Sequence, residues 1–445
     1  MTAKFSNYND ILKYLDIEDI SRSQKNINLR ESVFDFKLDF DSFLESLNDR
    51  YRELESIDFS GSIFKYSLDL YLTKQETVYD KKNNFKEFIY RKTKIKVKLD
   101  FGSCHFMDYV QFSGIEFCKD LNIDNSIFEK EVKFTEITFN QYFRLFETTF
   151  NDNVTFAYLE LGSKSIFYSN IKDKPKFKRD VIFVGVTFNE AKFWDFDFPN
   201  DVYFQNSIFN CPVFFNNSKV GGKIDFTSLE TIGLTKFNNK VYFDYAQINE
   251  LTLERIILEK PVSFNYTKIS SISIENVHCL GISISLVGTI IDNVKDEGTA
   301  RFLKTEAMKS NNPFLVAELN AKEMTMHFKG LKWRKHFFDK LIFLLNKSST
   351  NFGEKWEKGA LFIFLVWTFS FSLLIMLRDG IGKTFIWSDE NYRKEAINFL
   401  WQFGSLDILD NSYSWATILV FIISKILIIY GVYQTIAAFR KYGKK

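Results

Sequence analysis

The residues that could carry catalytic or metal chemistry in this chain of 445 residues are few and lie far apart. No two cysteines form a CxxC pair, and no histidine stands at ligand spacing from another ligand; the residues concerned are His105, His278, His327, His336, Cys104, Cys118, Cys211 and Cys279. Catalytic and metal sites need such groups in clusters. We therefore expect a protein that is not an enzyme and has no cofactor or metal site, with reduced, packed cysteines.

A phosphate-binding loop is suggested by the letters GIGKT at residues 380–384. The full motif also needs a glycine five residues before Gly382, and Leu377 occupies that position inside an apolar run. Nucleic acid is not favoured either, because 58 basic and 56 acidic residues leave a net charge of only +2. The sequence therefore predicts neither a nucleotide nor a nucleic-acid partner.

Lys425 is the charged residue whose position is most informative. It is the one charge in an apolar run from Tyr413 to Phe439, roughly 15 Å from either end of a membrane span. A lysine at that depth costs about 2.5–3.5 kcal/mol on insertion scales. Two explanations stay open. Either Lys425 faces a water-filled cavity or pore between protomers, or a tilted or shortened helix lets it meet backbone carbonyls or the outer interface.

A second apolar run, Gly359 to Leu377, has no charge and is long enough to cross a hydrocarbon layer about 30 Å thick. The segment before it, Leu331 to Lys347, is basic and amphipathic, which is typical of a helix in the membrane interface; an ordinary soluble helix is the alternative. Aromatic and basic residues near the ends of these segments are expected to anchor them at the interfaces: Trp333, Lys335, Trp356, Trp415, Arg440 and Lys441.

Many basic residues precede the first span and follow the second, whereas the loop that connects the two spans has only four basic residues. This asymmetry predicts that both ends of the chain lie in the cytoplasm and the loop outside, in a multi-pass protein of a bacterial inner membrane. The N-terminus lacks the apolar run and cleavage site of a signal peptide.

The loop also contains a short apolar helix, KEAINFLW, that is similar to the pore helix of two-span channels. However, the following FGSLD is not a TVGYG filter.

In the middle of the chain, large apolar residues recur every 11 residues in two series, one that begins at Phe101 and one that begins at Phe106. The positions are Phe101, Phe112, Ile123, Phe134, Leu145, Phe156, Phe167, and Phe106, Phe117, Phe128, Phe139, Phe150, Leu161. Many are preceded, two positions earlier, by a small or β-branched residue such as Cys104, Ser126 or Thr148. A period of five to six residues suits short extended sides that meet at corners, closing a coil of about 22 residues. Stacked coils would bury equivalent positions in ladders.

This pattern resembles the pentapeptide-repeat family, which implies a β solenoid of the right-handed quadrilateral type with Phe or Leu at the centre of each side. An extra residue in every second side departs from the strict five-residue rule. The C-terminal part, Ala300 to Lys445, is similar to a group of bacterial pentapeptide-repeat membrane proteins that have a helical hairpin and two transmembrane helices. That resemblance implies an architecture and no activity.

The sequence therefore predicts five parts. They are an N-terminal helical cap (1–55), a β-helix (56–298, with an insertion at about 65–95), a helical hairpin (299–330), a basic amphipathic interfacial segment (331–358) and a two-span membrane domain (359–445).

Two functions from different classes remain as hypotheses. The first is a scaffold, in which the cytoplasmic β-helix is held at the lipid bilayer by two spans and recruits an unidentified protein partner. The second is a homo-oligomeric ion channel or membrane-permeabilising effector whose pore passes Lys425. A homo-oligomer is the expected state in the bilayer, and the pore hypothesis requires one because two spans per protomer cannot enclose a pore.

Overall fold

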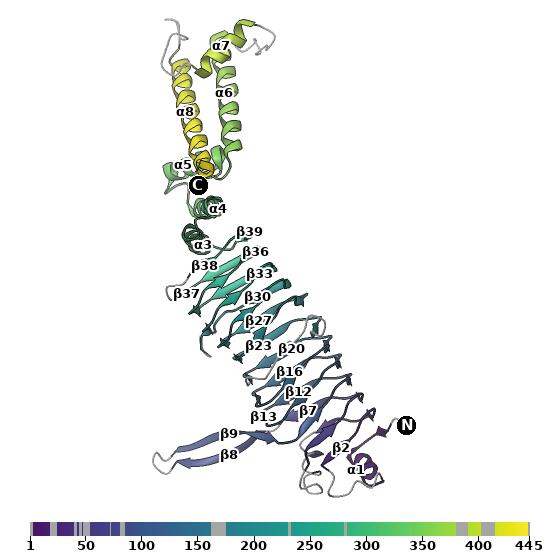
Figure 1. The fold of residues 1–445 in the computed structure, drawn as a ribbon. Coiled ribbons are helices and arrows are strands. Elements are labelled where there is room, and N and C mark those ends of the chain that lie inside the picture. The colour runs from purple at the N-terminus through teal and green to yellow at the C-terminus, as the bar shows by residue number, and fades with distance from the viewer. Residues whose placement is uncertain are drawn as a thin grey trace. The chain divides into compact units, whose positions relative to one another are not determined.

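The computed structural model describes residues 3–17, 25–39, 42–43, 47, 54–71, 73–80, 85–161, 175–229, 233–279, 283–379, 390–401 and 414–443. The chain forms two compact units, Met1–Lys295 and Asp296–Lys445. The first consists mainly of short strands and the second of helices (Figure 1).

The strands of the first unit pair in sheets that we number I to V. Sheet I contains β1 (Lys4–Phe5), β3 (Val33–Phe34), β6 (Ile63–Phe64), β11 (His105–Phe106), β15 (Ile127–Phe128), β19 (Thr149–Phe150) and β22 (Lys176–Phe177). Sheet II contains β4 (Leu38–Asp39), β7 (Leu68–Tyr71), β12 (Val110–Ser113), β16 (Val132–Thr135), β20 (Val154–Ala157), β23 (Val181–Val184), β27 (Val202–Gln205), β30 (Lys219–Asp225), β33 (Gln247–Glu254), β36 (Lys268–Glu275) and β39 (Ile290–Val294), with β26 (Asp197–Phe198) beside β30.

Sheet III contains β8 (Thr73–Asp80), β9 (Phe85–Ile95), β13 (Ile115–Phe117), β17 (Thr138–Phe139), β21 (Glu160–Leu161), β24 (Thr187–Phe188), β28 (Ile208–Phe209), β31 (Thr235–Phe237), β34 (Ile256–Leu258) and β37 (His278–Cys279). Sheet IV contains β2 (Asn26–Asn28), β5 (Ser56–Asp58), β10 (Lys98–Asp100), β14 (Leu121–Asn122) and β18 (Phe143–Arg144). Sheet V contains β25 (Ala191–Lys192), β29 (Val213–Phe214), β32 (Val241–Tyr242), β35 (Val262–Ser263) and β38 (Ile284–Ser285).

The chain contributes one strand to each of four sheets in turn and then returns to the first of them. From β10 in sheet IV it passes through β11, β12 and β13 to β14, again in sheet IV. Strands β10 and β14 are parallel, with Leu99 opposite Leu121. This is the arrangement of a β solenoid, in which equivalent residues of successive coils lie side by side and single coils depend on their neighbours for burial. The β-solenoid prediction is confirmed at this level.

Phenylalanine ladders fill the inside of the coils. Phe128 stacks on Phe106 with ring centroids 4.5 Å apart and on Phe150 at 5.1 Å. A second ladder joins Phe134 to Phe112 at 5.1 Å and to Phe156 at 5.2 Å, and all six rings are at most 1% exposed. The predicted stacking of residues 22 positions apart is therefore confirmed. The apolar period exists because each side of a coil sends one large side chain inward.

The small residues before these phenylalanines have a second role, because several of them carry a hydroxyl group. Ser126 Oγ donates to the carbonyl of Phe101 at 2.6 Å, and Thr148 Oγ1 donates to the carbonyl of Ile123 at 2.8 Å. Both hydroxyls are buried. A corner leaves backbone carbonyls without a strand partner, and these hydroxyls of the following coil satisfy them.

Many corners contain a residue with a left-handed backbone, which lets the chain turn within two residues. Glu136, Tyr158 and Gly185 occupy equivalent corners of successive coils, with φ of 55°, 54° and 63°. At Gly185 a side chain would meet a further obstacle, because a Cβ would lie 2.7 Å from the ring of Tyr158. Glycine is therefore required there by space as well as by conformation.

Residues 1–55 differ from the predicted helical cap. Their described residues include helix α1 (Tyr8–Ile17) and helical positions at Ser42, Phe43 and Leu47, but strands β2, β3 and β4 already pair in parallel with β5, β6 and β7. The helical prediction is therefore wrong for residues 26–39. The reason is that inward residues such as Ile27 and Phe34, which are buried, follow the coil period there.

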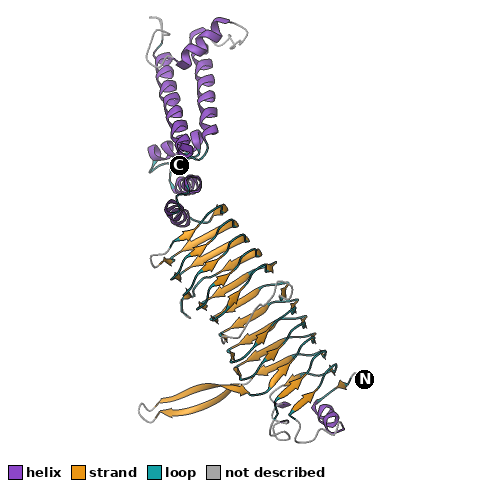
Figure 2. Ribbon diagram, viewed as in Figure 1, coloured by secondary structure: helices purple, strands orange, loops and turns teal. Residues whose placement is uncertain are grey.

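The predicted insertion at about 65–95 is also shorter than expected, because β7 belongs to sheet II. The inserted part is an antiparallel hairpin in which Thr73 of β8 pairs with Lys92 of β9 and Asp80 pairs with Phe85. Figure 2 shows this hairpin extending sideways from the stacked strands. Near its end β9 rejoins the solenoid, since Thr93 pairs with Ile115 of β13.

The second unit begins with the predicted helical hairpin, α3 (Glu297–Lys309) and α4 (Pro313–Gly330). Asp296 caps α3 by accepting from Thr299 N, and Asn312 caps α4 by accepting from Leu315 N. The remaining helices are α5 (Phe337–Thr350), α6 (Trp356–Asp379), α7 (Glu390–Trp401) and α8 (Trp415–Gly443). Both α6 and α8 contain a stretch that is long and apolar enough to cross a membrane, Trp356–Leu377 and Trp415–Arg440.

Candidate functional site

Lys425 lies inside the helical unit, and its side chain reaches the end of α7. The residue is 6% exposed, and Nζ donates a hydrogen bond to the backbone carbonyl of Phe399. Nζ also lies 4.3 Å from the ring centroid of Phe399 and 5.2 Å from that of Phe421. Phe399 is in the last turn of α7, where helix carbonyls carry partial negative charge. This contact corresponds to the second explanation, in which Lys425 meets backbone carbonyls.

Helix α7 is held between the two long helices. Trp367 of α6 donates from Nε1 to the carbonyl of Ala396 at 2.9 Å, so α6 and α8 each provide a donor to α7. An apolar cluster surrounds these contacts: Phe371, Ile375, Ala396, Phe399, Phe421 and Ile428. Helix α7 corresponds to the short apolar helix predicted in this loop, but no pattern in the sequence indicates Phe399 or Trp367 as partners. The letters FGSLD and GIGKT lie outside the described residues.

Helices α6 and α8 are antiparallel and approach closely at two glycines. A Cβ on Gly359 would lie 2.2 Å from Thr435 Oγ1, and one on Gly431 would lie 2.7 Å from a side-chain carbon of Ile363. Small residues at such positions let membrane helices pack by direct van der Waals contact. The pair is therefore a packed hairpin.

The outward side chains of the two long helices are large and apolar around the level of Lys425. Exposed residues include Phe364, Leu365, Phe369, Leu419, Ile422, Ile423, Ile426 and Ile429. Such a surface suits contact with lipid chains. Lys425 itself points into the helical unit and is buried.

The predicted interface anchors lie in different settings. Trp333, Lys335, Trp415 and Arg440 are exposed, and Trp415 is 86% exposed at the start of α8. Trp356, at the start of α6, is half-buried and packs on Phe439 with ring centroids 4.7 Å apart. Lys441 lies in α8, outside the residues whose side chains are described. Exposed aromatic and basic residues at helix ends fit the predicted anchoring role.

Helix α5 presents an apolar surface that the helical unit leaves uncovered. Its exposed residues are Phe337, Phe338, Leu341, Ile342 and Leu344, and Phe338 is 75% exposed. Lys340 turns back, with Nζ donating to the carbonyl of Leu331 at 2.7 Å and lying 5.0 Å from the ring of Trp333. This surface is what an interfacial helix needs.

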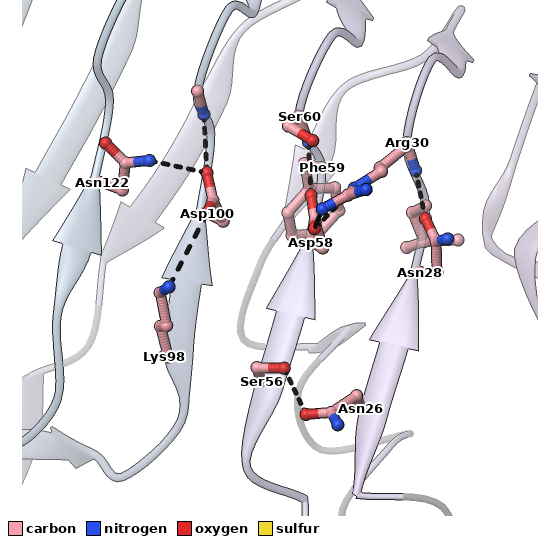
Figure 3. Close-up of polar contacts among 12 residues, drawn as sticks. Asn26, Asn28, Arg30, Ser56, Asp58, Phe59, Ser60, Lys98, Asp100 and Asn122 are labelled. Carbon is pink, nitrogen blue, oxygen red and sulfur yellow. Dashed lines mark hydrogen bonds and ion pairs between the residues drawn. The ribbon is translucent and has the colours of Figure 1, made fainter.

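The β solenoid carries a polar ladder along the outer face of sheet IV (Figure 3). Asp58 Oδ1 accepts from Ser60 N at 2.9 Å, and Asp100 Oδ1 accepts from Gly102 N at 3.0 Å. Arg30 Nε donates to Asp58 Oδ2 at 2.7 Å. Burial raises the pKa of Asp58, but hydrogen bonds from Arg30 and Ser60 outweigh it and hold the pKa below its usual value. These side chains are engaged in fixing corners, so the ladder stabilises the fold.

The described residues contain no group of three or more His, Cys, Asp and Glu side chains that could hold a metal ion. Cys104 is buried, and this burial raises the pKa of its thiol to about 12. Its Sγ lies 3.1 Å from the carbonyl of Phe59. A thiol in this state is a packing residue and a poor nucleophile.

Comparison of the chain with protein-family models, with curated proteins and with solved structures finds no match.

Proposed function

We propose that the chain is a non-enzymatic integral protein of a bacterial inner membrane that acts as a protein-interaction scaffold. Helices α6 and α8 anchor it, both termini lie in the cytoplasm, and its solenoid is a right-handed quadrilateral β-helix of the pentapeptide-repeat type. The four-sheet cycle and the phenylalanine ladders support the quadrilateral form. The observation that carries the anchoring role is the burial of Lys425 against the carbonyl of Phe399.

The alternative is an oligomeric channel or membrane-permeabilising effector. It requires a polar path between protomers with Lys425 facing water. The buried Lys425 and the apolar outward surface of α6 and α8 favour an anchor, because a pore-lining face would need polar groups accessible to water.

Purified full-length protein in planar lipid bilayers separates the two functions. We expect no unit conductance over a wide voltage range, for the wild type and for Lys425→Leu alike. Unit conductance that changes in Lys425→Leu would overturn the anchor and establish the pore.

Topology is tested separately. Alkaline phosphatase fused after Lys445 is expected to be inactive, since the reporter folds only outside the cytoplasm. High activity would contradict the proposed orientation of the spans.

A further inference from the structure

The polar and apolar sides of helix α5 are reversed relative to those of a helix that faces water. Lys340 and Lys347 turn toward α4, where their Nζ atoms lie 5.2 and 5.5 Å from the ring centroid of Phe328. Asn346 Oδ1 accepts from the hydroxyl of Tyr430 of α8 at 2.6 Å. A surface helix in water directs such polar residues outward and its apolar residues inward. The surroundings of the outward side of α5 are therefore expected to be apolar.

The side chains that α5 directs outward are large and apolar. Phe338 is 75% exposed and Ile342, one turn later, is 55% exposed. Phe337 and Leu341 are exposed beside them, and this spacing places all four on one side of the helix. Apolar patches of this kind mark sites of contact with a membrane or with another protein. The outward side of α5 therefore needs a partner that covers it.

The position of α5 beside the two long helices indicates which partner that is. Tyr430, which contacts α5, belongs to the stretch Trp415–Arg440 that can cross a membrane. Thr350, at the end of α5, lies beside α6, because a Cβ on Gly359 would lie 3.1 Å from its methyl group. Helix α5 thus packs at the end of the α6–α8 pair where the chain ends (Figure 1). A bilayer that surrounds the exposed apolar residues at that end, such as Ile436, also reaches α5.

The charges before α5 indicate the class of lipid. Residues 331–347 contain five lysines and arginines but a single carboxylate, that of Asp339. Lys332, Arg334 and Lys335 are exposed, and no ion pair joins them to a carboxylate in the part of the chain that the structure describes. Each basic residue close to an acidic membrane surface strengthens binding to it.

A second copy of the chain is a less suitable partner for this surface. In a symmetric contact between two copies, the same patch lies on both sides of the interface. The three exposed cations would then face three more of the same sign, whereas acidic headgroups supply the opposite charge. Charge and apolar surface together therefore favour an acidic lipid leaflet.

We propose that α5 and the segment before it bind acidic phospholipids of the cytoplasmic leaflet. Phosphate oxygens of the headgroups accept hydrogen bonds from Lys332, Arg334 and Lys335, while Phe338 and Ile342 lie among the acyl chains. This inference rests on the membrane anchor proposed above and deepens it, because it adds a third contact with the bilayer and names the class of lipid that this contact selects.

The partner is identified by photo-crosslinking of the full-length protein, with p-benzoylphenylalanine in place of Phe338. The protein is reconstituted in vesicles of equal parts phosphatidylglycerol and phosphatidylcholine with the same acyl chains, irradiated, and examined by mass spectrometry. We expect lipid adducts, with phosphatidylglycerol exceeding phosphatidylcholine at least about threefold. Covalent dimers of the chain in place of lipid adducts would show that a second copy covers α5 and would overturn the proposal. Equal labelling by the two lipids would overturn the selection of acidic headgroups.

Two triple variants with the same change of charge locate the selectivity. The first neutralises the cations before α5 by Lys332→Gln, Arg334→Gln and Lys335→Gln, and should bring the ratio of the two lipid adducts to about one. Labelling itself should persist, because Phe338 stays in the bilayer. The control neutralises three exposed lysines of the solenoid by Lys96→Gln, Lys119→Gln and Lys240→Gln, and should keep the preference. A preference that survives in the first variant, or that is lost equally in both, would contradict the assignment.

Failure of this inference is distinguishable from failure of the proposed function. A second crosslinker in place of Ile422, which is 46% exposed on α8, reports on the span itself. Lipid adducts from position 422 without any from position 338 would overturn only the assignment of α5. No lipid adducts from position 422 would overturn the membrane anchor.

Discussion

Lys425 of α8 donates a hydrogen bond to the backbone carbonyl of Phe399 in the last turn of α7. This contact ties a short helix to a long one and gives a buried ammonium group a partner. Lys425 therefore stabilises the packing of α7 against α8 within one chain.

Lys425→Met should loosen α7. The substitution keeps most of the side-chain volume but leaves the Phe399 carbonyl without this donor, at a cost of about 1–3 kcal/mol. Amide hydrogen exchange of a peptide covering residues 390–401, measured by mass spectrometry in micelles, should become faster. The control Lys394→Met removes an exposed lysine that pairs with Glu390 and should change exchange little. Unchanged exchange in Lys425→Met would contradict the structural role.

Phe128→Ala should strongly destabilise the solenoid. Its ring stacks on Phe106 and Phe150, so truncation leaves a cavity and removes two stacked contacts. The free energy of unfolding, measured in urea with the full-length protein in micelles, should fall by about 3–5 kcal/mol. Tyr66→Ala removes a ring that is 51% exposed and should cost about 0.5 kcal/mol or less. Similar losses in both variants would show that the ladder is not the core.

Gly359→Val should separate α6 from α8. Because a Cβ at this position would lie 2.2 Å from Thr435 Oγ1, the helices must move apart, at a cost of about 1–3 kcal/mol. The thermal midpoint of helix loss in micelles, followed by circular dichroism, should decrease. In Gly330→Val the new Cβ meets nothing within 4 Å, so this variant serves as the control. A midpoint equal to that of the control would refute the close packing.

Asp58→Asn should lower stability in a pH-dependent way. The folded-state pKa of Asp58 is lowered, so its ionised form stabilises the fold at a pH above the ordinary carboxyl pKa of about 4. That contribution is lost as the pH falls through the folded-state pKa. At pH 7 the variant should be less stable than the wild type by about 1 kcal/mol, and the difference should shrink as the pH falls below about 4 toward the folded-state pKa. Asp292→Asn, at an exposed position, is the control. A difference that does not shrink as the pH falls below about 4 would contradict the explanation.

Much of the solenoid follows from the sequence because its core is periodic. Phe106, Phe128 and Phe150 recur at a fixed interval, and a fixed interval of large residues requires coils of fixed length. The N-terminal coil escaped prediction because the inward residues Ile27 and Phe34 are separated from the next coil by a segment with helical spacing. The pairing of β2 with β5 and of β3 with β6 shows that Ile27 and Phe34 belong to a coil.

The site at Lys425 could be predicted from the sequence only in part. The sequence alone shows that Lys425 is an isolated charge in an apolar run. Its contact with Phe399 could not be predicted, because that contact depends on how α7 packs against α8.

The register of the coils has a consequence for how such a chain can change its length. Val110 lies opposite Val132, and Gln111 lies opposite Lys133. Deleting residues 111–132 would join Val110 to Lys133 in the same strand context as before, with one ring fewer in each ladder. Loss or duplication of a whole 22-residue module therefore preserves the corners in this part of the solenoid, whereas a long insertion extends out of the coil, as the β8–β9 hairpin does.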